Sequence, residues 1–85
     1  MTTWGKLIEE AMKKRGETLA DIESITLSPE ETDVPFDNGY GSTEGRPFTA
    51  WTAKTVYFPV CYDGVEWVGS VSRHPDGKPT DHQGY

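Results

Sequence analysis

The chain is poor in cysteine, in basic residues and in long apolar runs. Its single cysteine, Cys61, forms no internal disulfide, and structural zinc sites use several cysteine or histidine ligands. No stretch approaches the roughly 18 apolar residues of a membrane span. The N-terminus also lacks the apolar segment of a secretory signal. We therefore expect a cytoplasmic protein without a membrane segment.

The charge balance argues against direct nucleic-acid binding. Eight lysines and arginines stand against 14 aspartates and glutamates in 85 residues, a formal net charge of −6, and phosphate contacts require basic side chains. Three tryptophans, four tyrosines and three phenylalanines supply apolar surface for one small core. We expect a single small domain over residues 1–73, followed by a proline- and glycine-containing tail over residues 74–85.

The first fifteen residues predict an amphipathic helix. Thr2 or Thr3 can cap its start, and Gly16 stands where a helix ends. Weaker capping signals at Thr18 and Ser28 predict two short helical turns. The apolar residues of the first helix recur at helical spacing along one stripe, which consists of Trp4, Leu7, Ile8, Ala11 and Met12.

Residues 48–73 predict a β-hairpin that turns at Asp63-Gly64. The turn places one nearly continuous apolar face on the hairpin, and we expect the helix to pack there. The missing N–H of Pro59 would point away from the hairpin partner, so its strand is expected to be an edge there, or bulged. The fold class is therefore α+β, an N-terminal amphipathic helix packed on a small antiparallel sheet. The cross-strand pairs of the apolar face are Tyr62–Val65, Val60–Trp67, Phe58–Gly69 and Val56–Val71.

An acidic block occupies the segment between Arg15 and Arg46, which contains no lysine or arginine. Such a block can steer the basic surface of a partner protein. Alternatively, its members cap helices and keep a small protein soluble. The candidate partner-binding residues are Glu17, Asp21, Glu23, Glu30, Glu31, Asp33, Asp37 and Glu44.

A second candidate surface combines aromatic rings with a cation. If Tyr57 faces the surface, it shares strand parity with Trp51 and lies near Arg73. Such a set could stack a base and hold a phosphate, or anchor a protein partner. The alternative is that Trp51 fills a second small core.

Catalytic and metal-binding signals are weak. Imidazole and carboxylate groups suit zinc or manganese, but those of the tail, at His74, Asp76, Asp81 and His82, follow no rigid ligand spacing. Cys61 lies near Glu66 rather than near a cation, which does not favour a thiolate. We expect neither a cofactor nor enzyme activity.

One set of short segments carries a resemblance to known proteins: Phe36-Asp37-Asn38-Gly39-Tyr40-Gly41, Glu44-Gly45, Phe48-Thr49-Ala50-Trp51-Thr52, Val56-Tyr57-Phe58-Pro59, Tyr62-Asp63-Gly64, Glu66-Trp67-Val68 and Arg73-His74-Pro75. Through them, most of the chain resembles small acidic proteins encoded by tailed bacteriophages and prophages. The resemblance implies a phage or prophage origin, and hence the host cell cytoplasm, but no activity or site. Short acidic phage proteins often bind and disable a host factor.

The leading hypothesis is a non-enzymatic accessory protein that binds and modulates a host protein through its acidic surface. One alternative is a small-ligand or nucleotide-binding protein that uses the aromatic and arginine face. The other is a structural or assembly protein that self-associates, as a homodimer, through an edge strand.

Overall fold

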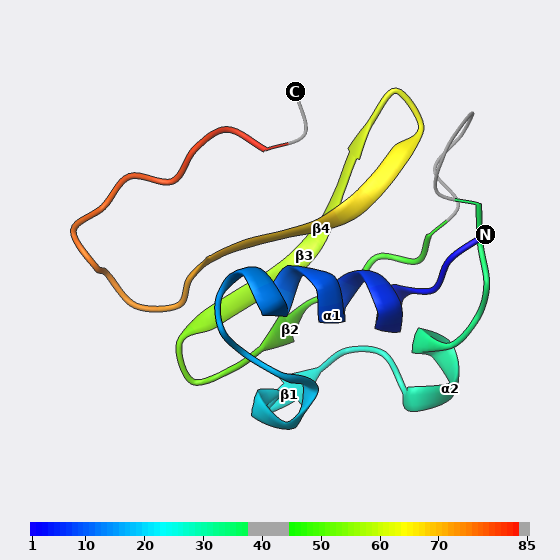
Figure 1. Cartoon of the computed structure of the whole chain (residues 1–85), viewed down its shortest axis with the longest axis horizontal. Helices are drawn as coiled ribbons and strands as arrows, with labels where there is room; N and C mark the ends of the chain where they lie inside the picture. The colour runs from blue at the N-terminus through cyan, green and yellow to red at the C-terminus, as the bar shows by residue number, and fades with distance from the viewer. Residues whose placement is uncertain (38–44, 84–85) are drawn as a thin grey trace.

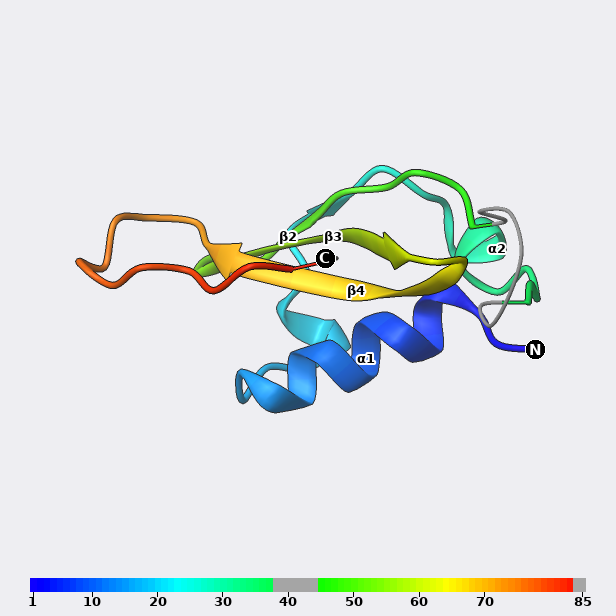
Figure 2. The same cartoon turned by 90° about the horizontal axis from the view of Figure 1, so that it is seen from above.

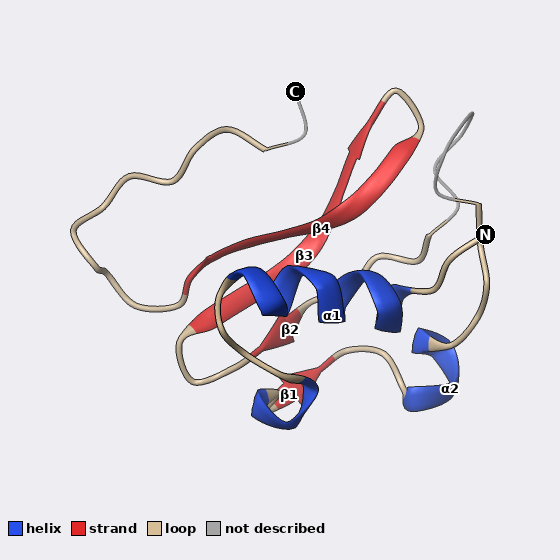
Figure 3. Cartoon of the chain, in the orientation of Figure 1, coloured by secondary structure: helices blue, strands red, loops and turns tan. Residues whose placement is uncertain are grey.

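The chain folds into a helical layer packed on an antiparallel sheet, which confirms the predicted α+β class. The structure, a computed structural model, describes residues 1–37 and 45–83 (Figure 1). The first helix, α1 (Trp4–Lys14), lies along one face of the sheet (Figure 2). It packs chiefly against β4 (Val65–Ser72). Two short helical turns, over residues 19–21 and 29–32, flank the first short strand (Figure 3).

The ends of α1 agree with the sequence prediction. Thr3 is the N-cap, and its hydroxyl oxygen accepts a hydrogen bond from the Lys6 amide at 3.2 Å. Lys13 and Lys14 lie in the last turn, where their charges complement the helix dipole. The side chains of the predicted stripe that are buried are Trp4, Ile8 and Met12.

Capping hydrogen bonds also stabilise the two shorter helical turns. In η1 (Leu19–Asp21), the carboxylate of the last residue accepts a hydrogen bond from the Thr18 amide at 2.8 Å. In α2 (Pro29–Thr32), the Ser28 hydroxyl oxygen accepts from the Glu31 amide at 3.2 Å. The Glu31 carboxylate accepts in turn from the Ser28 amide at 2.9 Å. Both turns begin at the predicted capping residues.

The predicted hairpin is confirmed in its turn and its register. β3 (Thr55–Tyr62) and β4 meet at Asp63 and Gly64, whose φ angles are 50° and 82°. Positive φ at both positions is the signature of a type I′ turn. The pairs observed across the two strands include Tyr62–Val65, Val60–Trp67, Phe58–Gly69 and Val56–Val71.

The sheet has the order β1-β2-β3-β4, so β4 lies at one end. The strands β1 (Ser24–Ile25) and β2 (Ala50–Trp51) are short, and β2 pairs with β3 only at Val56 and Tyr57. Pro59 therefore lies on a part of β3 that β2 does not reach. This confirms the expected edge at Pro59.

The sheet face that packs against α1 is opposite to the predicted one. The core joins the buried side chains of α1 to Tyr57 and Val68 of the hairpin and to Ala50 of β2. Leu27, Phe36 and Phe48 complete the buried cluster. The predicted contact surface for the helix was therefore wrong, and we call that surface the outer face. It consists of Val56, Phe58, Val60, Trp67 and Val71.

Buried polar residues explain why the alternation of apolar and polar residues along the strands predicted the wrong packing face. Thr55 and Glu66 are each 2% exposed. The Thr52 hydroxyl accepts hydrogen bonds from the amides of Lys54 and Thr55 at 3.2 and 2.9 Å, and the Gly45 amide donates to Glu66 at 2.9 Å. These bonds satisfy polar groups inside the core. Hydrophobic periodicity treats such polar residues as exposed to solvent, and it therefore predicts that the more apolar face of the hairpin is buried.

Candidate functional site at the outer edge of β4

Several members of the acidic block have roles within the fold. Asp21 and Glu31 cap helical turns, and Glu31 also forms an ion pair with Arg46. Hydrogen bonds from the Ser28 amide and hydroxyl, together with the Arg46 charge, outweigh slight desolvation and lower the pKa of the Glu31 carboxyl below 4.5. Glu44 lies outside the described residues, and the exposed members are Asp21, Glu23, Glu30, Asp33 and Asp37.

Tyr57 is not a surface anchor, contrary to the sequence prediction. Its side chain is fully buried, and its hydroxyl donates a hydrogen bond to Glu17 at 2.5 Å. Burial and the hydrogen bond and charge of Glu17 raise the pKa of Tyr57 above 10. Desolvation alone raises the pKa of Glu17, but hydrogen bonds from Tyr57, Thr52 and Thr55 and the charge of Lys54 outweigh it and lower that pKa.

The two other predicted anchors do come together. Trp51 and Arg73 line one shallow cavity of about 400 Å³ with Glu23 and Ser24. The Arg73 guanidinium donates to Glu23 at 3.0 Å and to the carbonyl oxygen of Thr52 at 2.9 Å. Arg73 therefore has two partners within the fold, and one of them is a member of the acidic block.

The outer edge of β4 presents backbone groups to a residue of the tail. In an antiparallel pair, the N–H and C=O groups of alternate residues point away from the partner strand. In the observed register, these are the groups of Glu66, Val68, Ser70 and Ser72. The Gln83 side chain donates to the Ser70 carbonyl at 2.9 Å, and the Ser70 amide donates to the Gln83 oxygen at 3.3 Å. Gln83 thus pairs with β4 much as a neighbouring strand does.

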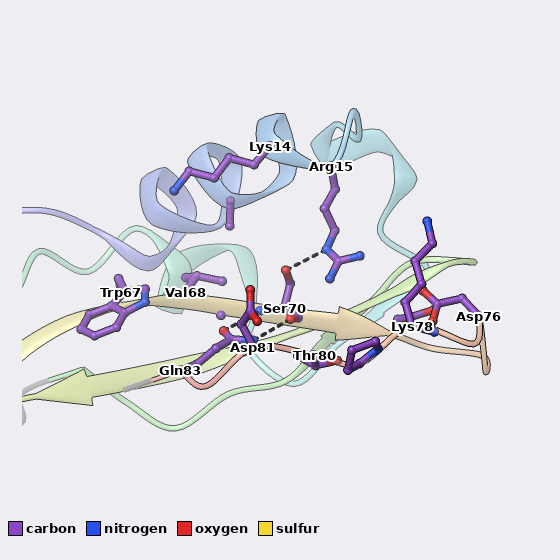
Figure 4. A pocket seen from close by; sticks show the side chains of 14 residues that line it. Lys14, Arg15, Trp67, Val68, Ser70, Asp76, Lys78, Thr80, Asp81 and Gln83 are labelled. Atoms are coloured by element: carbon purple, nitrogen blue, oxygen red, sulfur yellow. Dashed lines mark hydrogen bonds between the residues drawn. The ribbon is translucent and has the colours of Figure 1, made fainter. Parts of the chain in front are cut away.

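A cavity of about 430 Å³ lies between this edge, the C-terminal end of α1 and the tail. Lys14, Arg15 and Lys78 line it, and Figure 4 shows Arg15 above Ser70. Arg15 Nε donates a hydrogen bond to the Ser70 hydroxyl at 2.8 Å. Asp81 projects from the tail to the helix side of β4 (Figure 4). The site therefore combines a strand edge, occupied at Ser70 by Gln83, with three cations and the carboxylates of Asp76 and Asp81.

The outer face is an apolar surface that α1 does not cover. Val60 is buried on this face, whereas the side chains of Val56, Phe58, Trp67 and Val71 are half-buried. Towards the turn, Tyr62 and Val65 are 56% and 43% exposed. The paired part of the hairpin places no charged side chain on this face.

The candidate metal ligands lie in the tail, and the single thiol lies on β3. Within residues 1–37 and 45–83, no three histidine, cysteine, aspartate or glutamate side chains gather closely enough to hold a metal ion. This range includes His74, Asp76, Asp81 and His82. Cys61 is exposed and lies across the hairpin from Glu66.

Sequence reasoning missed the residues that form the β4 site. Three consecutive cations in an acidic chain, Lys13, Lys14 and Arg15, are the one sequence signal of a local anion-binding surface there. Ser70 and Gln83 carry no comparable signal, because their pairing depends on how the tail returns to β4.

Comparison with protein-family models, curated proteins and solved structures finds no match. In the described part of the chain, no helix has the length and apolar character needed to cross a bilayer. The phage or prophage origin stays a prediction from the sequence.

Proposed function

We propose that this protein is a non-enzymatic binding module that receives an extended segment of a partner protein as an added strand along β4. The supporting observation is the pair of hydrogen bonds between the Gln83 carboxamide and the backbone of Ser70. A carboxamide presents a donor and an acceptor side by side, as a peptide group does. Gln83 therefore occupies the position of one residue of a fifth strand.

The two edges of the sheet differ in their capacity to accept a strand. On the opposite side, β1 has two residues, and the open part of β3 contains Pro59. β4 has eight residues and no proline. Long edge strands without proline or a bulge readily pair with another chain. The β4 edge is thus the better docking surface.

The functions expected from the sequence have less support. A partner bound through the acidic block would compete with the caps and ion pairs formed by Asp21, Glu23 and Glu31. A base-stacking site on Trp51 and Tyr57 would need the buried tyrosine at the surface. A host protein as the partner stays a prediction that depends on the phage origin.

Self-association through β4 is also less favourable. A two-fold axis perpendicular to the sheet near Ser70 would place the α1 helices of both copies side by side. Lys14 and Arg15 of one copy would then face the same cations of the other. Like charges at such close range oppose pairing. A partner of different sequence avoids this repulsion.

The test is a peptide selection on the full-length chain carrying Gln83→Ala, which leaves the Ser70 backbone accessible. Peptides selected from a random display library are titrated against this variant by fluorescence anisotropy. We expect bound peptides to slow amide hydrogen exchange at Val68 and Ser70. Binding without that protection would overturn the proposed site.

A matched pair of substitutions isolates the backbone of Ser70. Ser70→Pro removes the outward N–H and leaves the β3–β4 ladder intact, because Ser70 does not donate to β3. Ser70→Ala removes the hydroxyl and keeps the N–H. In the Gln83→Ala chain we expect Ser70→Pro to weaken peptide binding about tenfold relative to Ser70→Ala. Equal affinities would contradict strand addition. Amide exchange supplies the second measurement if the proline variant does not fold.

A further inference from the structure

The chemistry of the cavity beside β4 indicates what kind of segment the edge receives. We infer that the recognised segment carries a carboxylate that faces Arg15 and Lys14, and that the tail residue Asp81 holds the same place within this chain. This inference rests on the proposed function and specifies the partner class as an acidic, extended segment of a protein. It concerns the side of the β4 edge that faces α1, where side chains rather than backbone groups determine which segment binds.

The position of Arg15 defines the side chain that an added strand would present. The Ser70 side chain lies on the same sheet face as Tyr57, its cross-strand partner, and this face packs against α1. A residue paired with Ser70 in an added strand would point its side chain to that same side. Arg15 lies on that side and donates a hydrogen bond of 2.8 Å to the Ser70 hydroxyl.

The local charge is unusual for this chain. Among the described residues, the ion pairs join Arg46 to Glu31 and Arg73 to Glu23, so neither uses the cations of the β4 cavity. Lys14, Arg15 and Lys78 line the cavity together with Asp76 and Asp81, so cations outnumber carboxylates there on a chain whose net charge is −6. The electrostatic stabilisation of a bound carboxylate is largest where positive potential is concentrated beside low-dielectric protein.

The tail shows what such a segment looks like when bound. Asp81 and Gln83 are two residues apart in the tail, and both side chains line the cavity beside β4. Gln83 reaches the Ser70 backbone, and Asp81 lines the cavity with the cations (Figure 4). The tail thus offers β4 a peptide-like group and a carboxylate together, the two features we assign to the partner.

Tethering makes the tail a strong competitor. A short flexible linker holds its end at an effective concentration on the order of millimolar near its site. A partner segment of equal intrinsic affinity would therefore not displace it at micromolar concentration. Partner binding requires that the segment forms more strand hydrogen bonds than the single carboxamide of Gln83 does.

The experiment uses the full-length chain carrying Asp81→Asn and Gln83→Ala, which keeps the tail but weakens its competition. The probe is a fluorescein-labelled synthetic peptide with the sequence of residues 77–85, compared with the same peptide carrying Asp81→Asn. We expect the aspartate peptide to bind at least about fivefold more tightly at low salt. We also expect the difference to shrink at 300 mM salt, since screening weakens exposed charge pairs.

A double-mutant comparison assigns the effect to Arg15. Arg15→Gln in the protein should remove the difference between the two peptides, whereas Lys6→Gln, an equal change of charge at the other end of α1, should retain it. Equal binding of both peptides would overturn the acidic specificity and leave strand addition standing. If neither tail peptide binds, the inference fails, and failure of the display-selected peptides as well would overturn the proposed function.

Discussion

At the scale of single residues, Tyr57 connects the sheet to the segment that follows α1. Its ring is part of the core, and its hydroxyl reaches Glu17 at 2.5 Å. Tyr57→Phe keeps the ring and removes the hydrogen bond to a carboxylate. We expect a loss of about 1–3 kcal/mol in the free energy of unfolding, measured by urea denaturation. Tyr62→Phe, at a side chain that is 56% exposed, is the control and should change it by less than about 0.5 kcal/mol.

The same residue makes stability depend on alkaline pH. Burial, with the hydrogen bond and charge of Glu17, raises the pKa of Tyr57 in the folded chain above its ordinary value of 10.0. The folded state therefore holds this proton more tightly than the unfolded state does. The resulting stabilisation is fully present below pH 10 and decreases as pH rises above it.

We expect the urea midpoint of the wild-type chain to fall as the pH rises from 10 to 11. The fall should be smaller in Tyr57→Phe, which has no such proton to lose. Identical pH profiles in the two chains would show that another group controls alkaline unfolding.

At the scale of elements, two valines of β4 report which sheet face is the core. Val68 is buried with α1, whereas Val71 is half-buried on the outer face. We expect Val68→Ala to destabilise the chain by about 2 kcal/mol and Val71→Ala by less than about 1 kcal/mol. Thermal unfolding monitored by circular dichroism measures both. A larger loss for Val71→Ala than for Val68→Ala would indicate that α1 packs on the outer face, as the sequence pattern predicts.

Local signals predicted the individual elements well. The caps at Thr3, Thr18 and Ser28 and the hairpin register follow from chemistry within a few residues. The packing face did not follow from the sequence, because both faces of the hairpin carry large apolar side chains. The choice depends on Thr55 and Glu66, whose burial requires partners from distant segments.

The candidate site was less predictable than the fold. The acidic block is evident in the sequence, but its members turn out to cap helices, pair with arginines or face solvent. The β4 site joins Arg15, Ser70 and Gln83, which are 55 and 13 residues apart along the chain. Such separations leave no periodic pattern, so a single sequence gives no indication that these side chains meet.

At the scale of the whole molecule, α1 covers one face of the sheet, and within residues 1–37 and 45–83 no helix covers the outer face (Figure 2). The edge of β4 receives the tail, while the outer face receives no helix. A two-layer α+β chain of this size thus has one packed core and one apolar surface in contact with water. The two sides of the molecule therefore differ, because α1 covers one face of the sheet and the apolar side chains of the outer face lie on the other.

The outer face sets the colloidal behaviour of the protein. At neutral pH the net charge of −6 keeps copies apart, but near the isoelectric point of about 4.7 this repulsion vanishes. We expect static light scattering to rise sharply near pH 4.7, and Val65→Thr, which keeps the charge and makes the outer face more polar, to reduce the rise. Equal scattering by both chains would show that another surface causes the copies to associate. A smaller rise in Val65→Thr would instead mean that the net negative charge is what keeps this apolar surface dispersed at neutral pH.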